Sequence, residues 1–179
     1  MEEQTLIKQL KATETKAKAF EYLVERYQKK LYWHIRHLVL SHDDTDDILQ
    51  ETFIKVFKSI DSFREESSLF SWMYRIATNQ ALDFLKKKAR EKHCSFEDFQ
   101  QERVTQLQSD VYFEGDEIQL KLQKAIACLP EKQQIVFKMK YFEELKYEEI
   151  SAILGTSVGA LKASYHHAVE KIKIYVESH

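Results

Sequence analysis

Residues 147–172 read YEEISAILGTSVGALKASYHHAVEKI, a pattern that predicts two amphipathic helices joined by a tight turn at Gly155. Apolar residues recur at helical spacing in both segments, and Ser157 stands where it can cap the second helix. The opposite face of the second helix carries small residues and hydrogen-bond donors: Gly159, Lys162, Ala163, His166 and His167. Because such a face suits the major groove of DNA, we predict a helix-turn-helix. An ordinary helical hairpin packed in a core is the alternative interpretation.

Composition restricts the fold class. The chain has 179 residues, of which 44% are hydrophobic and 31% charged, with only three glycines and one proline. Few turn residues and frequent helical spacing predict an all-α protein. No apolar run approaches the roughly 20 residues of a membrane span, and the first residues lack the features of a signal peptide. We therefore expect a cytoplasmic protein without direct membrane insertion. Cys94 and Cys128 lack paired spacing and are expected to be reduced, structural thiols.

Charge is distributed unevenly along the chain. The formal net charge of -2 argues against binding nucleic acid by bulk electrostatics alone. A basic cluster runs from Lys86 to Lys92, whereas residues 91–116 hold seven acids against two bases and have weak periodicity. This stretch is predicted to be an acidic linker. It divides the chain into two small helical domains, residues 1–90 and 117–179, of which the second contains the helix-turn-helix.

In the N-terminal module, an apolar stripe from Phe20 to Leu38 predicts a long core helix over about residues 16–40. The next predicted helix, over residues 44–60, has one apolar face for the core and a second apolar cluster turned away from it. The second cluster and the groups beside it are Asp47, Gln50, Glu51, Ile54 and Phe57. A surface of apolar, amide and acidic groups suits a protein partner better than DNA, whose phosphates would repel the acids. A fully buried helix is the alternative.

A polar loop over residues 61–69 precedes a predicted helix over residues 70–88. Opposite the apolar stripe of that helix lies a polar row that continues into the basic cluster: Arg75, Asn79, Asp83 and Lys86. Arginine and asparagine beside lysines suit nucleic acid. A solvated polar face without a partner is the default alternative for such a row.

Several of these segments, in this order, resemble one known family. The matching segments are DDILQETF (46–53), Phe63-Arg64 through Ser67, WMYRIATNQALD (72–83), LPEKQQ (129–134), YEEI (147–150) and LGTSVGALK (154–162). Together they closely resemble the extracytoplasmic-function (ECF) sigma factors of the sigma-70 family. The resemblance covers both modules and leaves out only the linker and the extreme termini.

The resemblance implies a specificity subunit that binds bacterial core RNA polymerase and promoter DNA, and that is neither an enzyme nor dependent on a cofactor or metal. It also implies an inhibitory anti-sigma partner. The first module would bind the minus-ten element through Phe63, Arg64, Ser67, Arg75, Asn79, Asp83 and Lys86. The second would bind the minus-thirty-five element through Ser157, Val158, Lys162, Ala163, His166 and His167. Asp47, Gln50, Glu51, Ile54 and Phe57 would contact the polymerase. Many relatives carry arginines on the recognition helix, whereas this chain has histidines, so the upstream sequence is not predicted.

Two other functions compete with this interpretation. A free-standing helix-turn-helix repressor or activator would use residues 1–90 as a sensing domain and would bind duplex DNA alone. A metal-dependent helical hydrolase is suggested by ligand-type residues within a short stretch: His34, His37, His42, Asp43, Asp44, Asp46 and Asp47. The acids, however, fall in a first helical turn, where the helix dipole already favours them.

Overall fold

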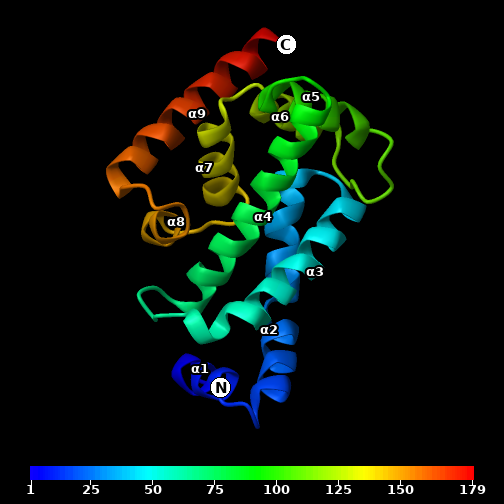
Figure 1. Ribbon diagram of the computed structural model, residues 1–179. Helices are drawn as coiled ribbons and strands as arrows, with labels where there is room; N and C mark the ends of the chain where they lie inside the picture. The colour runs from blue at the N-terminus through cyan, green and yellow to red at the C-terminus, as the bar shows by residue number, and fades with distance from the viewer.

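The computed structural model describes all 179 residues and confirms the all-helical prediction (Figure 1). The nine α-helices are α1 (Glu3–Lys11), α2 (Lys16–Val39), α3 (His42–Ser59), α4 (Leu69–Glu91), α5 (Phe96–Leu107), α6 (Glu117–Ala127), α7 (Glu131–Tyr141), α8 (Tyr147–Leu154) and α9 (Val158–Ser178). A short 3₁₀ helix, η1 (Ile60–Ser62), follows α3. None of these helices combines the length and the apolar character needed to cross a bilayer.

Helices α2, α3 and α4 pack against one another and form the centre of the N-terminal part, with α1 against the start of α2 (Figure 1). The apolar stripe predicted on α2 is buried, and Leu23, Leu31 and Ile35 have no solvent exposure. Helix α3 begins where Ser41 accepts a hydrogen bond from the backbone N–H of Asp44, and acids follow in its first turn. This capping role confirms the structural explanation of the acidic run.

The helix-turn-helix is formed by α8 and α9 as predicted. Gly155 ends α8 in the left-handed region, with φ 70°, and its N–H donates to the Ser151 carbonyl at 2.8 Å. The side chain of Ser157 then accepts from the N–H of Ala160 at 3.2 Å and caps α9. Local sequence therefore determines both ends of this turn.

Gly155→Ala should destabilise the protein through backbone strain alone, because a Cβ at this position would meet no atom within 4 Å. A left-handed alanine costs about 1–2 kcal/mol, which lowers Tm by roughly 3–6 °C in a protein of this size. Gly159→Ala is the matched control, since Gly159 also has open space around it but lies inside α9. Gly159→Ala should raise Tm, because alanine has a higher helix propensity than glycine. Equal shifts in a thermal unfolding experiment would contradict the strain argument.

The stretch predicted as a linker contains a helix. Helix α5 occupies residues 96–107 within the acidic segment 91–116 and buries Phe99, Val104 and Leu107 against α4 and α6. Ser95 caps α5 by accepting from the N–H of Asp98 at 3.0 Å. The linker segment thus holds a helix that the weak apolar periodicity of residues 91–116 did not predict. The main partners of Phe99, Val104 and Leu107 come from the two flanking helices, α4 and α6.

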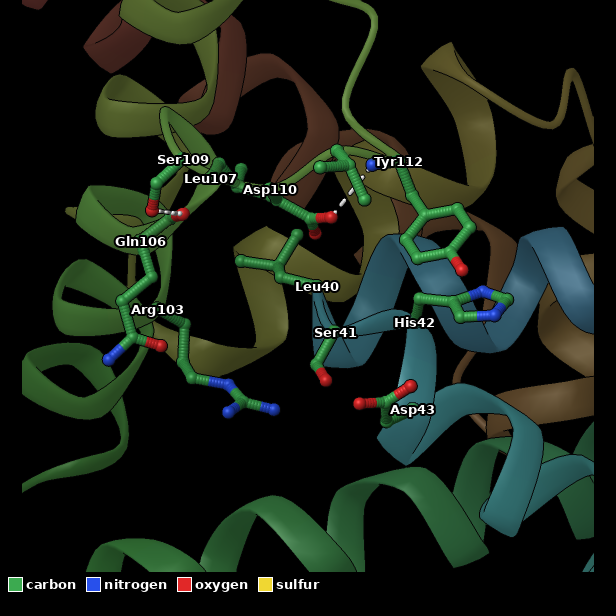
Figure 2. A pocket seen from close by; sticks show the side chains of 11 residues that line it. Leu40, Ser41, His42, Asp43, Arg103, Gln106, Leu107, Ser109, Asp110 and Tyr112 are labelled. Atoms are coloured by element: carbon green, nitrogen blue, oxygen red, sulfur yellow. Dashed lines mark hydrogen bonds between the residues drawn. The ribbon is translucent and has the colours of Figure 1, made fainter.

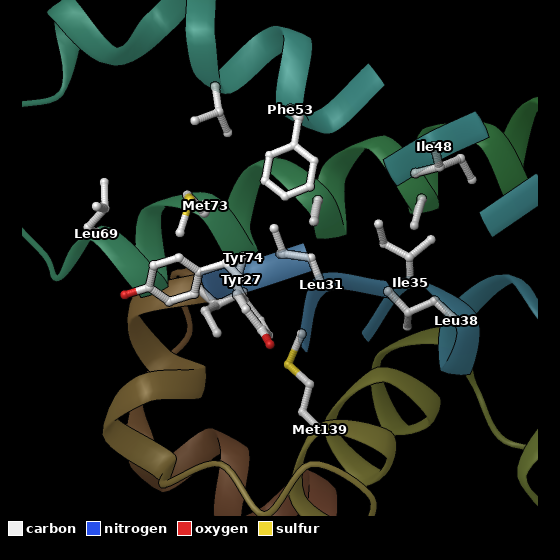
Figure 3. Close-up of a cluster of buried hydrophobic side chains, with 14 of the residues drawn as sticks. Tyr27, Leu31, Ile35, Leu38, Ile48, Phe53, Leu69, Met73, Tyr74 and Met139 are labelled. Atoms are coloured by element: carbon white, nitrogen blue, oxygen red, sulfur yellow. The ribbon is translucent and has the colours of Figure 1, made fainter. Parts of the chain in front are cut away.

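The N-terminal and C-terminal helices share one hydrophobic core. Met139 of α7 points toward Tyr27, Leu31 and Tyr74 of α2 and α4, as Figure 3 shows. Helix α8 packs along α4, and α7 packs against α2. The two parts of the chain are therefore in direct contact in this structure.

Candidate nucleic-acid and polymerase interfaces

The second apolar face predicted on α3 is exposed. Ile54 is 54% exposed and Phe57 38% exposed, whereas Phe53 and Val56 on the other side of the helix are buried. Asp47, Gln50 and Glu51 are also exposed. The ring of Phe57 packs on Phe20, with centroids 5.0 Å apart. We call the exposed set Asp47, Gln50, Glu51, Ile54 and Phe57 the α3 face. Its burial pattern contradicts the alternative of a fully buried helix.

The polar row on α4 also faces outward. Arg75, Asn79, Asp83 and Lys86 are all exposed. Two of the four already have partners in the C-terminal helices. The Arg75 guanidinium donates to the Ala152 carbonyl in α8, and the Lys86 ammonium lies 3.1 Å from a carboxylate oxygen of Glu131. The row is therefore at the border between α4 and the helix-turn-helix part.

The loop between η1 and α4 is held at its first residue. Phe63 is only 4% exposed, and its ring packs 5.0 Å from that of Trp72. Its carbonyl accepts a hydrogen bond from Lys11 at 2.7 Å. Arg64 is exposed and Ser67 is partly exposed. In this structure Phe63 anchors the loop, whereas the polar groups of Arg64 and Ser67 reach solvent.

The recognition face of α9 is open to solvent. Lys162, Ala163, His166 and His167 are exposed, and Val158 is partly buried at the start of the helix. The side chain of Ser157 is exposed but caps the helix, as described above. The opposite side of α9, which carries Leu161, Ala168 and Ile172, is buried. Helices α6, α7 and α8 cover it. This is the arrangement that a recognition helix needs: a packed apolar side and a free polar side.

The three histidines that suggested a metal-dependent hydrolase each contact a different partner. His34 binds Glu143, and His37 stacks on Phe142 with ring centroids 4.9 Å apart. His42 accepts from or donates to the Tyr32 hydroxyl at 2.6 Å and lies 3.3 Å from Asp46. Each histidine therefore has its own structural contact, and nothing brings the three together.

Buried polar groups lie between α2, α4 and α7 at positions that the sequence pattern did not indicate. His34, Thr78 and Lys138 are each no more than 2% exposed, although each side chain is polar or charged. Burial lowers the pKa of Lys138 to about 7. It also lowers the pKa of His37 to about 4, with the Glu143 carboxylate opposing this effect. Burial raises the pKa of the Tyr74 hydroxyl. These groups carry no alternation or spacing that would reveal them, because the helices that bury them are distant in sequence.

A cavity of about 320 Å³ lies where the end of α5 meets the turn between α2 and α3 (Figure 2). Arg103 and Asp43 line it, and the ring of Tyr112 stacks on His42 with centroids 3.9 Å apart. Asp110 accepts from the N–H of Tyr112 at 2.9 Å and also binds Arg36 at 2.9 Å. The cavity thus marks the place where the acidic segment attaches to the end of α2 and the start of α3.

Comparisons with known proteins agree with this geometry. Residues 23–91 match the family model of sigma-70 region 2, and residues 119–172 match that of sigma-70 region 4. The first match contains α3 and α4, and the second contains the helix-turn-helix. The two exposed faces therefore fall in two different conserved regions of one family.

Curated relatives cover nearly the whole chain. The ECF RNA polymerase sigma-E factor of Haemophilus influenzae is 34% identical over 164 residues, which is 87% of this chain and 86% of the relative. The ECF RNA polymerase sigma factor SigW of Bacillus subtilis is 32% identical over 163 residues, 87% of each chain.

Solved structures show the same fold. CnrH, solved with the cytosolic domain of CnrY, superposes with a TM-score of 0.71 at 19% identity, over 98% of this chain and 97% of that one. The sigma factor RpoE of Bartonella quintana, solved with the anti-sigma factor NepR, gives a TM-score of 0.66 at 21% identity. The superposition covers 89% of this chain and 98% of RpoE. With region 2 and region 4 both matched, and relatives above 30% identity along most of its length, this chain belongs to the ECF sigma factors of the sigma-70 family.

Proposed function

We propose that three exposed surfaces divide the work of promoter recognition in this sigma factor. The α3 face binds core RNA polymerase, the α4 row with Arg64 and Ser67 binds the minus-ten element, and the exposed side of α9 binds the minus-thirty-five element. The observation that carries this proposal is the exposure of apolar Ile54 and Phe57 on a helix whose other side is fully packed. Exposed apolar side chains beside acids fit a protein surface and not DNA phosphates.

The protein acts as a non-catalytic subunit in the cytoplasm, where polymerase and promoter meet. Within the minus-ten set, Phe63 contributes by anchoring its loop, because its ring is buried. The exposed polar groups Arg64 and Ser67 are better placed to bind a base taken out of the stack. Asp83 and Lys86 continue the strand path along α4.

An anti-sigma factor is the second partner that we propose. Support comes from the fold neighbours, since RpoE was solved with the anti-sigma factor NepR and CnrH with the cytosolic domain of CnrY. The α3 face is a candidate surface for such a partner, because an inhibitor that covers it would exclude polymerase.

Run-off transcription with purified core RNA polymerase on a library of random promoters tests the proposal. Selected promoters should share two short elements, and selection should require both core polymerase and this chain. A free-standing repressor would instead retard duplex DNA in a gel without polymerase. Failure of the chain to associate with core polymerase would contradict the proposal.

Asn79→Ala and Lys162→Ala should affect different promoter elements. Asn79→Ala should relax base selection in the minus-ten element and lower transcription about 5- to 100-fold, the range for one lost base contact. Lys162→Ala should weaken upstream binding and reduce the salt dependence of binding by about one counterion, as expected for a phosphate contact. Lys173→Ala, at an exposed position farther along α9, is the control. The assignment is wrong if both variants change the same element or neither.

A further inference from the structure

Helix α1 precedes the segment that matches region 2, which begins at residue 23, but it belongs to the main hydrophobic core. Three of its side chains are at most 2% exposed: Leu6, Ile7 and Leu10. The helix packs against α2 and η1, and Figure 1 shows it at the end of the molecule where α3 leads into the loop before α4. Its packing on η1 therefore brings α1 to the base of the 63–68 loop, which carries Arg64 and Ser67.

Lys11, the last residue of α1, binds the first part of the 63–68 loop. Its ammonium donates to the Phe63 carbonyl oxygen at 2.7 Å and lies 3.8 Å from a carboxylate oxygen of Glu65. It also lies 5.8 Å from the centroid of the Phe63 ring, within the range of a cation–π contact. Hydrogen bonds with a charged donor are stronger than neutral ones. One cation therefore fixes both the first and the third residue of the loop.

Glu3, the first residue of α1, binds the residue that follows the loop. Its carboxylate accepts a hydrogen bond from the backbone N–H of Leu69 at 3.1 Å. Leu69 begins α4, and the N–H groups of a first helical turn have no partner within their own helix. The side chain of Ser68 accepts from another of them, the N–H of Ser71, at 3.1 Å. Helix α1 therefore supplies part of the N-terminal cap of α4 and holds the loop at both ends.

Glu65 has a backbone conformation that needs such support. Its φ of 60° lies in the left-handed region, which residues other than glycine adopt only at a cost in free energy. They persist there when the surrounding structure holds them, and they gather at functional sites. Glu65 follows Arg64 directly and precedes Ser67 by two positions, so its φ angle determines the direction of the chain between these two residues. Loss of the Lys11 contacts would let the exposed groups of the loop take other directions.

We propose that Lys11 and Glu3 are positioning residues for the minus-ten element. They hold the 63–68 loop in the conformation that presents Arg64 and Ser67 to a base taken out of the stack. This inference rests on the assignment of the loop to the minus-ten element proposed above. A loop that is ordered before DNA arrives loses less conformational freedom when the base enters, which strengthens binding and preserves selectivity. Base selection thus depends on two residues that lie outside the region 2 match.

Lys11→Met tests the role in recognition, because it removes the charge and the donor but keeps a side chain of similar length. Promoters selected by the wild type are randomised in one element at a time, and run-off transcription measures the base preference in each element. Lys11→Met should lower transcription about 5- to 30-fold and flatten the base preference in the minus-ten element only.

Two further variants separate positioning from a general loss of structure. Lys11→Arg keeps a cationic donor and should restore both the amount of transcription and the minus-ten preference. Lys8→Met makes the same change at an exposed position of the same helix and should behave as the wild type. An unchanged minus-ten preference in Lys11→Met, or an equal loss of preference in both elements, would overturn the proposal.

Limited digestion with trypsin measures the hold on the loop without polymerase or DNA. Arg64 is exposed and trypsin cleaves after arginine, so the rate at which a fragment ending at residue 64 forms reports how often the loop opens. Cleavage there should be about 5- to 30-fold faster in Lys11→Met and in Glu3→Ala than in the wild type, with helical circular dichroism unchanged. Glu2→Ala, at the exposed residue before α1, is the control for Glu3→Ala.

The two experiments separate this proposal from the proposed function. Equal cleavage rates in the wild type and Lys11→Met would show that α1 does not hold the loop and would overturn the proposal. A wild-type chain that directs no transcription with core polymerase would instead contradict the proposed sigma function, whatever the cleavage rates.

Discussion

Ile54→Glu is expected to weaken binding of this sigma factor to core RNA polymerase about 30- to 1,000-fold while leaving Tm nearly unchanged. Ile54 is 54% exposed in the free chain, so the substitution removes no packing from the folded protein. In the complex the same side chain would be buried at the centre of the α3 face. Loss of a central apolar contact and burial of a new charge cost roughly 2–4 kcal/mol of binding free energy.

The matched control is Ile174→Glu on α9. Ile174 is 63% exposed, so the substitution is chemically the same and structurally at least as well tolerated, but it lies outside the α3 face. Affinity is measured by competition with a labelled sigma factor for core polymerase. Equal weakening by both variants would show a general effect of added acid, and wild-type affinity of Ile54→Glu would remove the α3 face from the polymerase interface.

Lys138→Met should be the most stabilising single substitution among those considered, raising the free energy of unfolding by roughly 3–5 kcal/mol at pH 7. Lys138 is 2% exposed, and burial lowers its pKa from 10.5 to about 7. Between these two values the unfolded chain binds the proton and the folded chain does not. The wild type therefore gains stability as pH rises from about 7 to 10.5, and methionine of similar length removes that dependence.

Denaturant unfolding at pH 7 and pH 10 measures this effect. The advantage of Lys138→Met over wild type should shrink as pH rises, because the unfolded wild-type chain then also loses its proton. Lys132→Met, at an exposed position of α7, should be nearly neutral at both pH values. A pH-independent gain would point to packing alone, and a loss of stability would mean that the Lys138 ammonium has a favourable partner.

Lys138 also lies near the N-terminal helices. Lys138 lies one helical turn before Phe142, whose ring stacks on His37 of α2, and its charge helps to lower the pKa of His37. Part of its burial therefore comes from the N-terminal helices.

Short-range signals in the chain determined α2, α3, α4, the capped helix-turn-helix and the sides of α3 and α9 that face solvent. Gly155 and Ser157 show why: a left-handed turn and a cap depend on residues within four positions of each other, so sequence alone specifies them. In the same way, the 3.6-residue period of a helix places Ile54 and Lys162 on the side opposite the apolar stripe, and both are exposed.

Only the tertiary structure decided the packing of α8 on α4, the helix in the acidic segment and the burial of Lys138 and His34. His34 and Glu143 are 109 positions apart, and no local pattern relates them. Burial of a polar group depends on which distant helix covers it, whereas helical period reports only which side of its own helix it occupies. For this reason the chain's motifs indicate its family, and its packing determines that the α4 row lies against α8.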